Sequence, residues 1–138
     1  MAKLTYLAAI HQAMDQAMDK DNNVFILGED VGLKGGVFGA TLGLQQKYGS
    51  ERVIDTPLAE SNIVGTGVGA AMMGKRPIAE IQFAEYILPA TNQIMSEAAK
   101  VRYRSNNDWS CPLTIRAPFG GGIHGALYHS QSIGRVFA

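Results

Sequence analysis

The sequence predicts an α/β domain with a mostly parallel sheet and helices on both of its faces. Four short apolar runs, typical of buried strands, occur at residues 24–27, 52–55, 76–83 and 111–116. Helical patterns separate them, and this alternation is typical of parallel sheets. Polar residues follow several of the runs, at the strand ends where α/β folds bind their ligands.

Length and charge limit the possible classes of protein. The 138 residues fit one domain, with expected bounds 1–138. Twelve basic and twelve acidic side chains cancel, which argues against nucleic acid or a membrane surface as a partner. No apolar run is long enough to span a bilayer, and we see no signal sequence. Cys111 is the single cysteine, so we expect a reducing, cytoplasmic location.

The first helix is expected after Thr5, a suitable N-cap, because apolar residues then recur every three to four positions. The strand at 24–27 leads into a glycine-rich loop that carries Glu29 and Asp30. These acids are either solvated or directed at a ligand. A second helix is expected at 41–48, closed by a glycine C-cap.

The strand at 52–55 precedes a helix over residues 59–73, and Glu60 lies in the first turn of that helix. A carboxylate there either complements the helix dipole, worth about 0.3–1 kcal/mol, or faces a ligand in the crevice. The glycines that follow indicate close packing. Residues 65–70 also match the G-x-G-x-x-A dinucleotide fingerprint, and Glu85 lies about 20 residues further on. A nicotinamide-dependent oxidoreductase is therefore an alternative.

The third strand, at 76–83, ends in hydrogen-bonding and aromatic groups that include Gln82 and Tyr86, a mixture that suits a small-ligand pocket. Pro89 then begins another helix, which ends in basic residues. These are solvated or, in a second alternative, form the interface of a non-catalytic association module.

The fourth strand, at 111–116, leads through three glycines into a polar cluster that contains His124 and His129. Histidine titrates near neutrality, so one of these residues can act as a proton shuttle. Their spacing of five residues does not match a helical metal-ligand pair. We also expect a further helix to begin after His129.

Six motifs carry a family resemblance: GEDV at 28–31, GGVF at 35–38, DTPLAE at 55–60, EIQF at 80–83, RYR at 102–104 and HGALYHSQ at 124–131. In order and spacing they closely resemble the beta subunits of 2-oxo acid dehydrogenase E1 components. The branched-chain (2-oxoisovalerate) members are most similar, because they share the last motif and the exit at 83–86. Pyruvate and acetoin dehydrogenases are close alternatives. Family beta subunits are more than twice as long, so we expect an N-terminal portion without the C-terminal domain.

This resemblance implies a thiamine diphosphate enzyme that oxidatively decarboxylates a small 2-oxo acid and passes the acyl group to the lipoyl arm of the E2 acyltransferase. The fold it implies is the thiamine diphosphate pyrimidine-binding fold, incomplete at its C-terminus. The cofactor would lie between this subunit and an E1 alpha subunit, in an alpha2beta2 assembly, and the alpha subunit would hold the diphosphate with Mg²⁺. The chain alone is then expected to be inactive.

The resemblance also assigns individual residues. Glu60 matches the glutamate that hydrogen-bonds the pyrimidine nitrogen N1′ and so favours the 4′-imino form of the ring. His129 matches the active-site histidine associated with acyl transfer, and Gln82 and Tyr86 match positions that line the cofactor pocket. A further match concerns backbone oxygens that bind a structural potassium ion, those of Cys111, Leu113 and Thr114.

Overall fold

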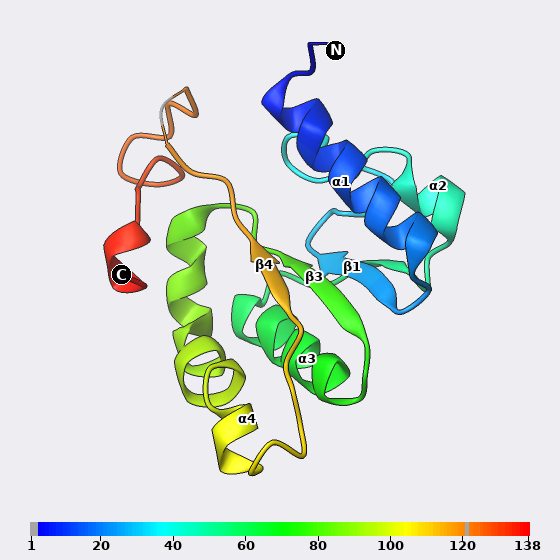
Figure 1. The fold of residues 1–138 in the computed structure, drawn as a ribbon. Coiled ribbons are helices and arrows are strands. Elements are labelled where there is room, and N and C mark those ends of the chain that lie inside the picture. The colour runs from blue at the N-terminus through cyan, green and yellow to red at the C-terminus, as the bar shows by residue number, and fades with distance from the viewer. Residues whose placement is uncertain (1–2, 121) are drawn as a thin grey trace.

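The computed structural model describes residues 3–120 and 122–138, and its centre is a four-stranded parallel sheet (Figure 1). The strand order is β2-β1-β3-β4. The strands are β1 (Val24–Gly28), β2 (Val53–Asp55), β3 (Arg76–Glu80) and β4 (Thr114–Arg116). The predicted parallel sheet and the α/β fold class are therefore confirmed.

Helices cover both faces of the sheet, as predicted (Figure 1). On one face lie α1 (Tyr6–Lys20) and α2 (Leu44–Tyr48). On the other lie α3 (Glu60–Met72), the 3-10 helix η1 (Ala84–Ala90) and the π-helix η2 (Gln93–Ala98), which continues into α4 (Val101–Arg104).

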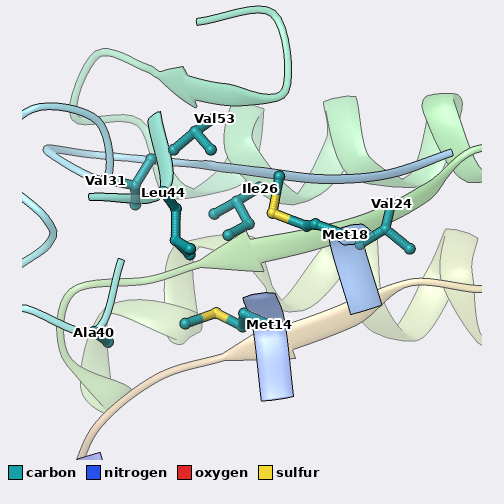
Figure 2. Packing of buried hydrophobic residues seen from close by; sticks show 8 residues of the cluster. All are labelled: Met14, Met18, Val24, Ile26, Val31, Ala40, Leu44 and Val53. Atoms are coloured by element: carbon teal, nitrogen blue, oxygen red, sulfur yellow. The ribbon is translucent and has the colours of Figure 1, made fainter. Parts of the chain in front are cut away.

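Alternate residues of β1 build the two halves of the core. Ile26 packs with Met14 and Met18 of α1 and with Leu44 of α2 (Figure 2). Leu27, the next residue, belongs to the cluster formed with α3 and η1. Because successive side chains of a strand point to opposite faces, one continuous apolar run supplies both layers.

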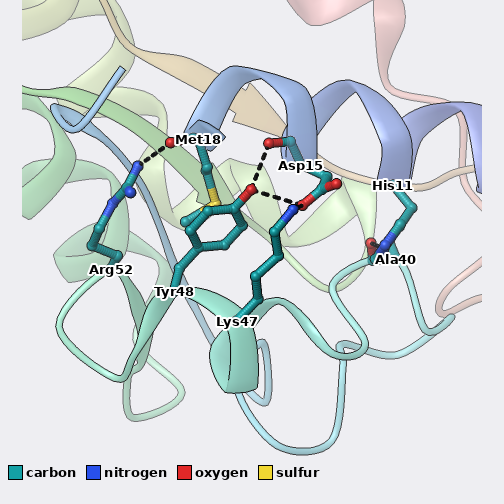
Figure 3. Close-up of polar contacts among 7 residues, drawn as sticks. All are labelled: His11, Asp15, Met18, Ala40, Lys47, Tyr48 and Arg52. Atoms are coloured by element: carbon teal, nitrogen blue, oxygen red, sulfur yellow. Dashed lines mark hydrogen bonds and ion pairs between the residues drawn. The ribbon is translucent and has the colours of Figure 1, made fainter. Parts of the chain in front are cut away.

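Polar contacts join α1 to the segment around α2 (Figure 3). The hydroxyl of Tyr48 lies 2.8 Å and Nζ of Lys47 2.7 Å from Oδ1 of Asp15. The hydrogen bonds from Lys47 and Tyr48 lower the pKa of Asp15. Arg52 reaches back to the carbonyl of Met18 at 2.8 Å. The amino end of β2 is thus held against the end of α1.

Several predicted boundaries were wrong. The helix expected at 41–48 begins only at Leu44, because Gly43 has a left-handed φ of +84° and interrupts the turn before it. The strand expected at 76–83 ends at Glu80. The strand expected at 111–116 begins at Thr114, since the N–H of Leu113 turns back to the carbonyl of Cys111 at 2.8 Å.

Two helix predictions also need correction. The helix expected to begin at Pro89 is instead the η1–η2–α4 series, with the proline inside η1. The helix expected after His129 is only a 3-10 turn, η3 (Gly134–Val136). In the part of the chain that the structure describes, none of the helices has the length and hydrophobicity of a membrane-spanning segment.

The connections leave β1 and β3 in opposite directions. From β1 the chain moves outward to β2, returns across β1 through α3 to β3, and then continues to β4 on the other side. Such a reversal is a topological switch point, and ligands of open α/β sheets bind outside the carboxyl ends of the strands there. The fold therefore places the candidate site beyond β1 and β3.

Candidate functional site

The carboxyl ends of β1 and β3 approach each other closely. Gly28 pairs with Glu80, and a Cβ built on Gly28 would come within 2.6 Å of the carbonyl oxygen of Glu80. A larger residue at position 28 would therefore push the two strands apart. The two loops that leave this point carry most of the predicted site residues.

Three hydrogen bonds hold the loop after β1. Oδ1 of Asp55, at the end of β2, accepts the N–H of Gly32 at 2.7 Å. The buried hydroxyl of Thr41 donates to the carbonyl of Val31 at 2.6 Å, and the N–H of Gly36 donates to the carbonyl of Asp30 at 2.7 Å. These contacts fix the backbone that follows Glu29, and β1 fixes the backbone before it, so Glu29 is held at the switch point.

Glu60 begins α3 at the same edge, and its side chain is half-buried. The pKa of Glu29 is raised, first by burial and then by the carboxylates of Asp30 and Glu60. Glu29 follows β1 and Glu60 follows β2, so both carboxylates lie at the same edge of the sheet. Within the described part of the chain, the side chain of Glu60 makes no hydrogen bond and no ion pair, so its carboxylate is available to a ligand.

Aromatic rings gather beyond the carboxyl end of β3. The ring of Phe83 lies 6.1 Å from that of Phe38 and 6.0 Å from that of Tyr86, both edge to face. The imidazole of His129 lies 4.0 Å from the Phe83 ring and 5.5 Å from the Tyr86 ring. The structure therefore brings together two predicted site residues, Tyr86 and His129, from opposite ends of this half of the chain.

Gln82 lies two residues after β3 and is half-buried, but among the described residues its side chain makes no hydrogen bond to Tyr86 or His129. The link between the two sides of the site runs through helix ends instead. The hydroxyl of Ser61, next to Glu60, donates to the carbonyl of Pro89 at the end of η1. The first turn of α3 and the helix that follows Phe83 are therefore in direct contact.

Sequence reasoning missed the role of Glu85. The sequence predicts for it only a place in the exit at 83–86 and the part of the distal acid in the dinucleotide fingerprint. In the structure its side chain is 7% exposed and accepts the backbone N–H of His129. The fingerprint itself is also corrected, because residues 65–70 lie inside α3 rather than in a turn between strand and helix. The signal for Glu85 was an acid in an otherwise apolar helix, Ala84–Ala90.

The residues predicted to bind potassium lie away from this cluster, at the entry to β4. Leu113 packs into the core beside α3, and the Cys111 carbonyl already accepts one hydrogen bond. Burial raises the pKa of the Cys111 thiol. Among the described residues no group of three His, Cys, Asp or Glu side chains can hold a metal ion.

Residues 2–138 match the family described as transketolase, pyrimidine binding domain. The chain belongs to this family. Its parallel sheet with helices on both faces is thus that of a pyrimidine-binding domain, and the fold implied by the sequence resemblance is confirmed.

Three relatives of this pyrimidine-binding domain are bacterial beta subunits. The 2-oxoisovalerate dehydrogenase subunit beta of Bacillus subtilis is 66% identical over 138 residues, and that of Pseudomonas aeruginosa is 49% identical over 137. The pyruvate dehydrogenase E1 component subunit beta of Acholeplasma laidlawii is 50% identical over 137 residues. The alignments cover 100%, 99% and 99% of this chain.

The chain spans only 42%, 39% and 42% of these three relatives' lengths. The resemblance to E1 beta subunits predicted from the sequence motifs is therefore confirmed, and it extends along essentially the whole chain. Whatever the rest of those subunits contributes lies outside the aligned region.

Proposed function

We propose that this pyrimidine-binding domain forms part of the beta subunit of a thiamine diphosphate-dependent E1 enzyme. The enzyme oxidatively decarboxylates branched-chain 2-oxo acids and transfers the acyl group to the lipoyl arm of E2. The observation that carries the proposal is the position of Glu60: a half-buried carboxylate in the first turn of α3, beside Glu29, at the switch point of the sheet.

The residues beyond the strand ends fit the aminopyrimidine of thiamine diphosphate. Glu60 offers a carboxylate to a ring nitrogen, and a hydrogen bond to a group that gains charge is strong where water is excluded. Phe83 and Tyr86 provide aromatic surface for a planar ring, and Gln82 provides an amide. When bound, the cofactor supplies an electron sink for decarboxylation.

His129 serves the second half of the reaction in this proposal. Its ring is packed against Phe83 and Tyr86, and the side chain is still 38% exposed. Reductive acylation of a lipoyl group requires a proton at a dithiolane sulfur, and an imidazole is a suitable donor near neutral pH. A fixed but accessible ring meets both requirements.

The assembly we propose places this chain beside an E1 alpha subunit that holds the diphosphate and Mg²⁺, in an alpha2beta2 enzyme of the cytoplasm. An apolar cavity of about 560 Å³ supports association with a partner chain. Its lining includes Tyr6 and Ile10 of α1, Phe38 of the first loop, and Phe119 beyond β4. Phe38 also contacts Phe83, so this apolar surface adjoins the aromatic side of the site.

A structural potassium ion is a further part of the proposal. Backbone carbonyls suit a hard monovalent cation, and those of Cys111, Leu113 and Thr114 lie in one short segment before and within β4. A melting temperature that rises with K⁺ but not with Li⁺ is the expected result, and equal responses to both ions would contradict it.

For the substrate, pyruvate is a specific alternative to branched-chain 2-oxo acids. The Acholeplasma relative, which is named for pyruvate, is 50% identical. The test is to co-express a beta subunit of the relatives' length that carries these residues with an alpha subunit. Decarboxylation of 2-oxoisovalerate and of pyruvate, and oxidative cleavage of acetoin, are then assayed with thiamine diphosphate. Branched-chain 2-oxo acids should be preferred in kcat/KM. A preference for pyruvate would favour that alternative, and inactivity with all three would contradict the proposal.

A further inference from the structure

Two buried polar atoms of one contact pair lack partners among the residues that the structure describes. They are Oε2 of Glu85 and Nδ1 of His129. Glu85 is 7% exposed, so its carboxylate is largely removed from water. A buried donor or acceptor without a partner costs about 1–3 kcal/mol, and more when it is charged. A carboxylate and an imidazole nitrogen that both lack partners are complementary to each other.

The geometry already brings them together. Oε1 of Glu85 accepts the backbone N–H of His129, and Nδ1 of the same histidine lies 3.9 Å from that oxygen. This distance is longer than a hydrogen bond, and a small rotation of the carboxylate or ring would close it. Phe83, at 4.0 Å and 38° to the imidazole, and Tyr86, at 5.5 Å, limit the other positions open to the ring.

The backbone conformation of His129 also requires a compensating contact. His129 has a left-handed φ of +70°, as do His124 and Ala126 earlier in the same segment. Residues other than glycine adopt this conformation at a cost, and surrounding contacts must compensate for it. The Glu85 carboxylate supplies one such contact, since it anchors the N–H of His129 to η1.

We propose that Glu85 is a positioning residue for His129. Its carboxylate accepts the Nδ1–H, fixes this tautomer, and leaves Nε2 as the nitrogen that exchanges protons with the substrate. A neutral imidazole has one donor and one acceptor, so a fixed acceptor at Nδ1 decides which nitrogen remains free. Carboxylates fix the tautomer of catalytic histidines in hydrolase triads in the same way. The role of Nε2 rests on the function proposed above, whereas the pairing does not.

Glu85→Gln separates tautomer control from loop anchoring. The glutamine oxygen can still accept the N–H of His129, so the anchor is kept. Its other group is an NH₂ donor, which requires Nδ1 to act as an acceptor and therefore places the proton on Nε2. The variant should thus exchange one tautomer for the other while the segment stays in place. A purely structural role for Glu85 predicts no such exchange.

The experiment is ¹⁵N NMR of histidine side chains in this chain. The chain has three histidines, and His129→Asn identifies the signals of His129. Neutral His129 should be the Nδ1–H tautomer in the wild type and the Nε2–H tautomer in Glu85→Gln, while exposed His124 should be the same in both. An Nε2–H tautomer of wild-type His129, or the averaged signals of a free imidazole, would overturn the pairing. The wild-type measurement decides even if the variant fails to fold.

A second measurement tests the role of Nε2 separately, in the assembled enzyme. Glu85→Gln should lower lipoyl acylation by about 10²-fold, the scale of a lost proton-transfer group, with KM for the 2-oxo acid unchanged. Glu85→Asp, which keeps the carboxylate, should recover part of the rate. If NMR shows the predicted tautomers but acylation is unaffected, the pairing stands and the function proposed for His129 is wrong.

Discussion

Glu60 is positioned by the helix it begins. Ala59, the N-cap of α3, has no side-chain hydrogen bond, so the first N–H groups of the helix are not capped by that residue. The positive end of the helix dipole attracts negative charge at this place. After burial and Asp30, Glu60 also contributes to the raised pKa of Glu29, because two carboxylates at one site repel each other. A ligand nitrogen that shares a proton with Glu60 relieves this repulsion.

We therefore predict that Glu60→Gln, in the assembled enzyme, lowers decarboxylation by at least about 10²-fold. Glutamine keeps an acceptor of nearly the same size but cannot take up or share the proton. The measurement is pre-steady-state decarboxylation at saturating cofactor. Glu51→Gln, the same change at an exposed acid before β2, is the matched control and should retain normal turnover. Normal turnover in Glu60→Gln as well would remove Glu60 from the mechanism.

A different phenotype is expected of His129→Ala. Since we place His129 at the transfer of the acyl group, the variant should decarboxylate the 2-oxo acid but acylate the lipoyl domain at least about 10²-fold more slowly. Assays of carbon dioxide release with an artificial electron acceptor and of lipoyl acylation separate the two steps. Equal loss in both assays would assign His129 to the earlier step, and no loss in either would exclude it.

At the scale of elements, the small residues of α3 have different roles along the helix. A Cβ built on Gly67 would lie 2.9 Å from Cδ1 of Leu113, near the entry to β4, whereas one on Gly69 would meet nothing within 4 Å. Gly67 therefore permits close packing, while Gly69 only weakens the helix. Alanine is favoured over glycine inside a helix by about 0.5–1 kcal/mol.

Gly69→Ala should accordingly raise the free energy of unfolding by about 0.5–1 kcal/mol. Gly67→Ala has the same gain in propensity, but the added methyl requires the end of the flexible Leu113 side chain to move, which offsets part of the gain. We expect the second variant to be less stable than the first. Urea unfolding followed by circular dichroism measures both. Equal stabilisation would show that Leu113 moves aside freely.

The sequence predicted some elements of the structure better than others. Apolar runs such as the one that contains Ile26 and Leu27 predicted the strands, because burial on both faces leaves a direct pattern in the sequence. The break at Gly43 and the start of β4 at Thr114 depend on local backbone conformation and pairing, which periodicity does not encode. The contact of Glu85 with His129 joins residues 44 positions apart. Nothing in the spacing of the sequence predicts such a contact.

At the scale of the whole molecule, one buried ion pair joins β3 to β4 and lies next to the loop after β1, which borders the site. Nη2 of Arg116 in β4 lies 2.8 Å from Oε2 of Glu80 in β3, and Glu80 is 3% exposed. The other oxygen of Glu80 lies beside Gly36, where an added Cβ would come within 2.8 Å of it. The charge state of Glu80 therefore affects the contacts that β3 makes with β4 and with the loop after β1.

The pH dependence of the free energy of unfolding should reveal the titration of Glu80. Burial raises the pKa of Glu80 above its ordinary value of 4.5, and Arg116 opposes the shift without cancelling it. The folded chain thus binds this proton more tightly than the unfolded chain. The contribution of Glu80 to stability is complete below pH 4.5 and is lost as the pH rises through the pKa of the folded state.

Glu80→Gln removes this titration and keeps an acceptor for Arg116. We expect the free energy of unfolding of the wild type, relative to Glu80→Gln, to fall as the pH rises above 4.5 and then to level off. Urea unfolding at a series of pH values measures the difference, and Glu51→Gln controls for the loss of one negative charge at an exposed position. If the wild type instead gains stability relative to the variant over this range, the attraction of Arg116 outweighs the cost of burial. The ion pair would then stabilise the ligand-binding edge in its charged form.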